Sequence, residues 1–271
     1  MTSNVFARLD NIGLVVEHGF DVAAAYERLG FAVCSLGRQT ARPDGHPAIP
    51  QATGSRCMNF ARNGYLELVG VIEPDLPASG YDERLATHGP GPVKVTLGWN
   101  DSEAGIDELK RLGLQPIGPV RFDRTYPVSG RQLTTEMELT ALDVSLGGLM
   151  AIATRHRRPS RTFPPATISH PNGAIGLDSV RIATPDPAGV MAGFGASPAT
   201  RSLSFPTGGR VDVVDADDTA IESIGIAVTD IERVAELFDE NAIEYHRDRD
   251  GLRATPSHDG AVPLVFTSPY G

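Results

Sequence analysis

One order of predicted elements recurs four times along the chain, and this repetition limits the possible folds more than any other feature. Each copy begins with an apolar strand; the four first strands are 8–16, 93–99, 177–183 and 221–228. Three pairs of matching positions have the same separation along the chain: Asn11 and Phe31, Lys94 and Leu114, and Ser223 and Ile243. A repeat with a constant internal spacing indicates duplicated structural units.

The first copy shows the full order of elements. Asp21 caps a predicted helix that Gly30 ends, and strands are predicted at 31–34, 56–61 and 65–70. The segment 37–53, rich in Pro and Gly, is predicted to be a long loop, of the kind that can cover a site. The later copies supply predicted strands at 116–122, 132–142 and 149–154; at 202–205 and 210–215; and at 244–247, 252–255 and 263–267. Each unit therefore has the order βαβββ.

The units are expected to form an α+β protein of two tandem domains. A stretch that is basic, then Pro-rich, and poor in periodicity predicts a linker at 158–174. The first two units then make up a domain at 1–157, and the last two a domain at 175–271.

Charge and composition exclude several kinds of partner. The net charge of −10 is unfavourable for binding nucleic acid or an anionic membrane. No apolar run reaches transmembrane length, and the first residues do not resemble a signal peptide. The two cysteines, Cys34 and Cys57, have neither zinc nor redox spacing, so we expect reduced thiols and a cytoplasmic protein.

A single carboxylate stands out in the segment 63–70. An Asn63-Gly64 turn opens a strand in which Tyr65 and Glu67 share one face, because side chains alternate along a strand. A charged residue between leucines is costly unless it faces a wet cavity, a cation or a hydrogen-bond donor. Glu67 is therefore the first candidate for a functional residue.

The paired βαβββ units, with Leu-Asp-Asn-Ile-Gly-Leu-Val-Val at 9–16 and Gly-Tyr-Leu-Glu-Leu at 64–68, resemble the vicinal oxygen chelate superfamily. This superfamily includes glyoxalase I, bleomycin-resistance proteins and extradiol dioxygenases. His46-Pro47, Gly54-Ser55-Arg56 and 65–68 are most similar to its glyoxalase-like branch. The resemblance implies that two units form a curved mixed β-sheet around a cup. It also implies a divalent metal, held by His or Glu from the first and last strands.

The positions that the resemblance assigns to metal ligands carry mostly other residues. Glu67 is present, but the matching positions of the first two units hold Asn11, Lys94 and, on the last strand, about Ala151. The second pair of units offers Ser179, Asp212, Ser223 and about Leu264. Amides, hydroxyls and ammonium groups are poor ligands for first-row metals. No complete metal site is expected; if a Zn, Fe, Mn or Ni ion is bound, Glu67 is its one matching ligand.

Candidate site residues follow from these considerations. For catalysis they are Glu67 as a base, Lys94 as an electrostatic partner and His46 as a proton shuttle in the loop. For substrate binding they are Asn11, Arg56, Tyr65 and Trp99. Each has a structural alternative: a degenerate ion pair, an exposed loop histidine, a surface arginine or a core aromatic.

Two hypotheses for function remain open. The first is an enzyme of the lyase or isomerase kind, or a dioxygenase, acting on a small oxygenated molecule. The second is a metal-free protein that binds or sequesters a small molecule, as the resemblance to bleomycin-resistance proteins implies. No Walker, Rossmann, Gly-x-Ser-x-Gly or His-Glu-x-x-His motif supports another chemistry. The second pair of units is expected to serve packing or a homodimer interface.

Overall fold

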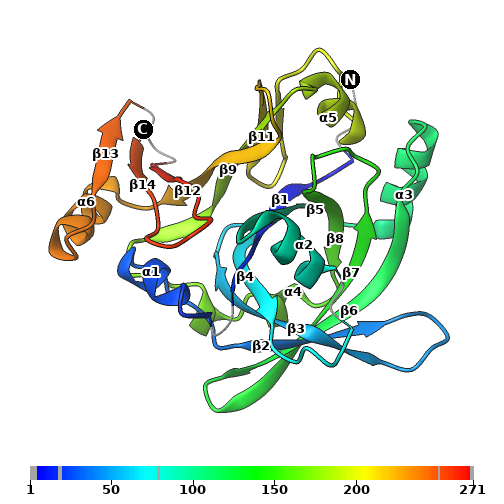
Figure 1. Ribbon diagram of the computed structural model, residues 1–271, viewed down its shortest axis with the longest axis horizontal. Coiled ribbons are helices and arrows are strands. Elements are labelled where there is room, and N and C mark those ends of the chain that lie inside the picture. The colour runs from blue at the N-terminus through cyan, green and yellow to red at the C-terminus, as the bar shows by residue number, and fades with distance from the viewer. Residues whose placement is uncertain (1–4, 18–19, 78–79, 250, 269–271) are drawn as a thin grey trace.

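A computed structural model describes residues 5–17, 20–77, 80–249 and 251–268. The chain folds into two curved mixed β-sheets with short helices on their outer sides, which confirms the α+β prediction (Figure 1). The first sheet ends at His156 and the second begins at Ala174. The exact domain limits stay a prediction.

The first two units build the N-terminal sheet. The first unit contains β1 (Arg8–Val15), α1 (Ala23–Arg28), β2 (Gly37–Arg42), β3 (Ile49–Asn59) and β4 (Tyr65–Val71), followed by α2 (Tyr81–His88). The second contains β5 (Gly91–Gly98), α3 (Ser102–Arg111), β6 (Ile117–Val128), β7 (Arg131–Ala141) and β8 (Met150–His156). The connection to the second sheet holds α4 (Pro159–Thr162) and a 3₁₀ turn (Pro165–Thr167).

The N-terminal sheet closes into a barrel in the order β1-β4-β3-β2-β6-β7-β8-β5. Its two halves meet where β1 pairs with β5 and where β2 pairs with β6, both antiparallel. Closure leaves no free strand edge and encloses an interior between the strands. Figure 1 looks along this barrel, with α2 drawn across the opening.

The last two units build an open sheet of seven strands, ordered β10-β11-β9-β12-β15-β14-β13. The third unit contains β9 (Ala174–Thr184), α5 (Pro187–Gly193), β10 (Ser202–Ser204) and β11 (Arg210–Asp215), one strand fewer than the predicted βαβββ order. The fourth contains β12 (Ala220–Val228), α6 (Ile231–Glu240), β13 (Tyr245–Asp248), β14 (Gly251–Ala254) and β15 (Leu264–Thr267). Because β10 and β13 lie at opposite edges, this sheet does not close.

One hydrophobic core joins the two sheets, with Leu9 and Ile12 from the barrel and Leu177 and Val211 from the open sheet in the same cluster. The predicted Asn63-Gly64 turn lies at this junction. Gly64 has φ 66°, and a Cβ there would approach the Asp10 carbonyl oxygen to 2.5 Å. The turn therefore needs a glycine. Asn63 Nδ2 donates to the carbonyl oxygens of Leu9 and Leu177, at 3.2 and 2.9 Å.

Three predictions for the first unit are wrong. Asp21 does not cap α1, whose N-cap is Val22 and which has no side-chain cap hydrogen bond. The segment 31–34 forms no strand, and 37–53 is not a lid but the β2–β3 hairpin, which supplies the barrel wall that pairs with β6. The hairpin was missed because a strand between solvent and a polar barrel interior lacks the usual apolar alternation. Helix α2 was not predicted either.

Candidate functional site in the N-terminal barrel

The barrel encloses a cavity of about 200 Å³. Its apolar wall comes from the second unit: Phe122, Met137, Leu139, Met150 and Ile152. Its polar side chains come from both units: Asn11, Gln39, Tyr65, Glu67, Tyr81, Lys94, Thr96 and Arg124. An apolar cavity with a few converging polar groups is typical of a small-molecule site.

Glu67 and Lys94 form an ion pair in this cavity. Lys94 Nζ lies 2.6 Å from Glu67 Oε2, and the side chains are only 11% and 4% exposed. Gln39 Nε2 donates to Glu67 Oε1 at 3.3 Å, and Lys94 Nζ donates to the Tyr81 hydroxyl at 3.4 Å. The strands impose this contact, because Gly13 on β1 pairs with Glu67 on one side and with Lys94 on the other.

The pair keeps both groups charged. Burial by itself raises the pKa of Glu67, but the charges of Lys94 and Arg124 outweigh it and hold that pKa below the usual value. Burial lowers the pKa of Lys94, but Glu67 outweighs this effect and the pKa of Lys94 is raised. At neutral pH, Glu67 is therefore an anion and Lys94 a cation while they remain in contact.

Two predicted substrate-binding residues, Asn11 and Tyr65, also line the cavity. The Asn11 amide donates to the backbone oxygens of Tyr65 and Ile12, at 3.2 and 3.3 Å, and its Oδ1 accepts from Thr96 at 3.4 Å. Tyr65 is 4% exposed, and burial raises its pKa well above the usual value. Asn11 is thus held by its neighbours, whereas Tyr65 contributes a neutral hydroxyl and a ring face.

Strand register corrects one position of the repeat. Gly13 pairs with Glu67 on the last strand of the first unit, and its counterpart Thr96 pairs with Ile152. The residue equivalent to Glu67 is therefore Ile152, not Ala151, which is buried in the core. In the open sheet, Arg181 pairs with Asp212 and Gly225 with Val265, so Val265 rather than Leu264 occupies this position. The sequence positions were wrong by one residue because the last strands start at different points relative to the turns.

In the barrel, the residues at the four positions that match metal-ligand positions of the superfamily do not fit a divalent metal. Asn11, Glu67, Lys94 and Ile152 offer one carboxylate, one amide already bonded to backbone, one ammonium and one alkyl group. The ammonium of Lys94 occupies the side of Glu67 where a cation would bind. No cluster of three or more His, Cys, Asp or Glu suited to a metal occurs within the described ranges.

Three predicted site residues lie outside the cavity. His46 is exposed in the turn of the β2–β3 hairpin. Arg56 points outward from β3, where it donates to the Cys34 carbonyl oxygen at 3.0 Å and contacts Glu27. Trp99 is 2% exposed and stacks on Phe6 in the core. The structural alternatives named from the sequence therefore apply: His46 is an exposed loop histidine, Arg56 points outward from the barrel, and Trp99 is a core aromatic.

Gln39, Tyr81 and Arg124 were not identified from the sequence. Arg124 lies on β6 between Phe122 and Tyr126, and alternation puts all three on one face of the strand. This signal was available for Arg124. Gln39 pairs with Arg124 across the seam between β2 and β6, and Tyr81 belongs to α2, so neither could be placed without the fold.

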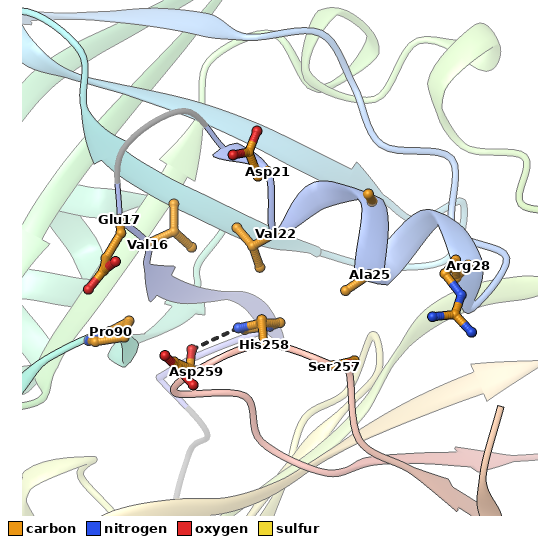
Figure 2. Close-up of a pocket in the computed structure, with 11 residues that line it drawn as sticks. Val16, Glu17, Asp21, Val22, Ala25, Arg28, Pro90, Ser257, His258 and Asp259 are labelled. Atoms are coloured by element: carbon orange, nitrogen blue, oxygen red, sulfur yellow. Dashed lines mark hydrogen bonds between the residues drawn. The ribbon is translucent and has the colours of Figure 1, made fainter.

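A larger cleft, of about 490 Å³, separates α1 from the segment 257–259 (Figure 2). His258 Nδ1 donates to the Asp259 backbone oxygen at 2.8 Å, and Nε2 lies 3.3 Å from the Tyr26 hydroxyl. The charged side chains along this cleft, Glu17, Asp21, Arg28 and Asp259, are exposed to solvent. The barrel cavity is therefore the better candidate site, because it buries its charges.

No helix within the described ranges is long and apolar enough to span a membrane.

Solved structures with low sequence identity share the whole architecture. A hypothetical protein from Staphylococcus aureus matches with a TM-score of 0.57 at 11% identity, covering 96% of this chain and 99% of its own. A variant of 4-hydroxymandelate synthase from Streptomyces coelicolor matches with a TM-score of 0.56 at 12% identity, covering 97% and 92%.

A fusion of a xylose isomerase-like TIM barrel with 4-hydroxyphenylpyruvate dioxygenase matches with a TM-score of 0.52 at 13% identity. It covers 96% of this chain but only 48% of the fusion protein. At these identities the three structures show a shared fold and nothing about chemistry. No curated protein sequence matches the chain.

A family model described as "Glyoxalase-like domain" matches residues 9–196. The match starts at the second residue of β1, covers the rest of the barrel and extends past α5 of the open sheet. It agrees with the resemblance of 46–71 to the glyoxalase-like branch of the vicinal oxygen chelate superfamily. The chain belongs to the glyoxalase-like domain family.

Proposed function

We propose that the barrel cavity binds a small oxygenated organic molecule, and that Glu67 and Lys94 move a proton on it in a lyase or isomerase step. The observation that carries this proposal is the buried Glu67–Lys94 pair, 2.6 Å apart, beside an apolar wall. An ion pair removed from water gains little stability over an apolar substitute, so its presence favours a functional role.

The reaction would begin when a substrate carbonyl oxygen accepts a hydrogen bond from Lys94 Nζ and displaces Glu67. Loss of its ammonium partner raises the pKa of Glu67 and makes it a stronger base. Glu67 then takes a proton from the carbon next to the carbonyl. The electron pair of that C–H bond forms a C=C bond, and the carbonyl oxygen becomes an enolate oxygen that Lys94 stabilises.

In the second half of the reaction, the enolate would react further and Glu67 would give up its proton. If Glu67 returns the proton to another carbon or to the other face, the product is an isomer of the substrate. If the enolate instead re-forms the carbonyl, its C=C electron pair forms a double bond to the next carbon, and a group on that carbon leaves with its bonding electrons and takes the proton from Glu67. The products are an unsaturated carbonyl compound and the protonated leaving group, and the step is a lyase reaction. Neither route changes the overall oxidation state, so no oxidant is required.

One observation favours binding without catalysis as the second candidate. While paired, Glu67 has a lowered pKa and Lys94 a raised one, which makes Glu67 a weak base and Lys94 a weak acid. If a ligand leaves the pair intact, the cavity only holds it. The protein would then sequester a small molecule.

Hydrogen–deuterium exchange distinguishes these candidates. The protein is incubated in D₂O with small methyl ketones and 2-oxo acids, and the loss of C–H signals next to the carbonyl is followed by proton NMR. Exchange is expected with the wild type, is expected to fall at least ~100-fold in Glu67→Gln, and should be unchanged in the control Asp212→Asn on the open sheet. Binding without exchange would favour sequestration; no binding to any compound would reject both candidates.

A further inference from the structure

Arg124 is a buried cation in the cavity that lacks a carboxylate of its own. Its residue is 3% exposed, and the guanidinium lies between the rings of Tyr65 and Tyr126, at 5.4 and 5.1 Å from their centroids. Nη1 donates to Cys57 Sγ. Nε and Nη2 are buried and have no hydrogen-bond partner among the described residues.

The charges around the cavity do not balance without a further anion. Glu67 carries one negative charge and lies against Lys94, so the second positive charge, on Arg124, is uncompensated. Below the Tyr65 ring, Asp10 is already paired with His156 and Arg8. Burial raises the pKa of Cys57 to about 12, so this thiol is neutral and is not the missing anion.

The two unpartnered atoms belong to one edge of the guanidinium. Nε–H and one Nη2–H point in the same direction, and this fork matches the two oxygens of a carboxylate. A buried donor without a partner costs free energy, and so does a buried charge without a counterion. Arg124 is one of the residues that line the cavity, so a ligand bound there would lie against this side chain.

We infer that Arg124 is an anion receptor, and that the ligand of this cavity is a small monocarboxylate with an apolar body. The inference rests on the proposed function, whose ligand it names by class. The carboxylate binds the Nε and Nη2 edge of Arg124, and the apolar body lies along Phe122, Met137 and Ile152. The remaining oxygen function of the ligand faces Lys94 and Glu67.

The size of the cavity limits this class further. A volume of about 200 Å³ is small compared with typical drug-binding pockets. It equals the share of about seven water molecules in the liquid, or a ligand of roughly ten non-hydrogen atoms. A dicarboxylate or a phosphate ester would bring more negative charge than Arg124 can neutralise, and is therefore disfavoured.

Benzoate and benzamide provide a matched pair of probes, equal in shape and different in charge. Binding of each is measured by titration calorimetry to the wild type, Arg124→Met, Arg124→Lys and the control Arg56→Met, whose arginine points outward from the same barrel. The wild type and Arg56→Met should bind benzoate about tenfold to a hundredfold more tightly than benzamide. In Arg124→Met the ratio should fall to about one, and Arg124→Lys should keep a reduced preference.

The melting temperature of Arg124→Met without ligand shows whether Arg124 is needed for the stability of the fold. Removal of an uncompensated buried charge should leave the melting temperature of Arg124→Met unchanged or higher. A large decrease, or failure to fold, would mean that Arg124 also serves stability, and the test then rests on Arg124→Lys. An unaltered benzoate preference in Arg124→Lys overturns the inference, and a reduced preference supports it.

The outcomes separate this inference from the proposed function. Equal affinity of the wild type for benzoate and benzamide, or no binding of either, overturns the receptor role of Arg124. Deuterium exchange on neutral methyl ketones would in that case still support Glu67 as a base. A benzoate preference that depends on Arg124, without any exchange, supports the receptor and leaves sequestration as the function.

Discussion

The barrel and the open sheet present a carboxylate at the same position of the repeat, in opposite surroundings. Glu67 is 4% exposed at its side chain and lies against the buried Lys94. Asp212 is 27% exposed, accepts from Ser202 at 2.6 Å and pairs with the half-exposed Arg210 at 2.9 Å. The first pair is removed from water, and the second is solvated.

Strand length accounts for this difference. In the barrel, β6 and β7 have 12 and 11 residues, and β6 reaches β2 to close the sheet. In the open sheet, β10 and β13 have 3 and 4 residues and lie at opposite edges. The same repeat therefore gives a buried cup where the strands are long and an exposed surface where they are short. Electrostatic interactions are stronger in the buried cup, because less solvent screens them.

The largest expected effect comes from breaking the barrel pair. Lys94→Met leaves Glu67 buried without a cation and should lower the unfolding free energy by about 3–5 kcal/mol at pH 7. The matched change Arg210→Met on the open sheet should cost about 1 kcal/mol or less, because that pair is solvated. Urea denaturation measures both. Equal losses would mean that the two carboxylates do not differ in environment.

A double-mutant cycle should sharpen the same comparison. Combining Glu67→Gln with Lys94→Met removes both charges, so the double variant should be more stable than Lys94→Met alone, with a coupling energy of about 2 kcal/mol. The cycle of Asp212→Asn with Arg210→Met should give less than about 1 kcal/mol. Additive effects at the barrel pair would argue against a direct interaction between Glu67 and Lys94.

A smaller effect is expected in acid, from Asp10 and its counterpart Asp178. Burial raises the pKa of Asp10, but His156 and Arg8 outweigh it and lower that pKa to about 2. Because the pKa of Asp10 is lower in the folded state than its unfolded value of 3.8, the ionised carboxylate stabilises the folded protein above that pH. This stabilisation is lost as the pH falls toward 2. The contribution is about 2 kcal/mol. Asp10→Asn should remove this part of the pH dependence between about pH 4 and 2, measured by urea unfolding.

Asp178→Asn is the matched control for that measurement. Asp178 is 28% exposed at its side chain and pairs with Arg210 at 3.1 Å on the open sheet. Its replacement should lower the unfolding free energy at pH 7 by less than Asp10→Asn does, since water screens its interactions. Equal losses for the two variants at pH 7 would contradict the contrast between the two sheets.

The smallest expected effect concerns α2, which crosses the barrel opening. Tyr81 packs with Val15, Val69 and Val93 in a separate small apolar cluster, and its hydroxyl accepts from Lys94. Tyr81→Phe keeps the packing and removes the acceptor, so it should cost about 0.5–1 kcal/mol in a thermal or urea unfolding experiment. A loss of several kcal/mol would show that the hydroxyl has a larger role than this one contact.

Sequence reasoning found the parts of the site that stand out from their neighbours. Glu67 was recognisable as a charge among leucines, and Lys94 as the residue of the second unit that matches Asn11 of the first. Arg124 was missed although alternation along β6 places it on the same face as Phe122 and Tyr126. His46 was predicted as a loop residue near the site, and Arg56 and Trp99 as substrate-binding residues, but loops and strand ends carry no pattern that fixes the direction of their side chains.

The sequence by itself determined the repeated unit, the α+β class and the presence of one costly acidic residue, Glu67, in the first half. These features are local, because alternation, caps and turns depend on residues a few positions apart. Only the tertiary structure decided that β2 and β6 close one sheet and that Gln39, Glu67, Lys94 and Arg124 meet in one cavity. These contacts join residues far apart in the chain, and they depend on strand length and register. A shift of one residue in the register would turn each side chain of a strand to the other face of the sheet.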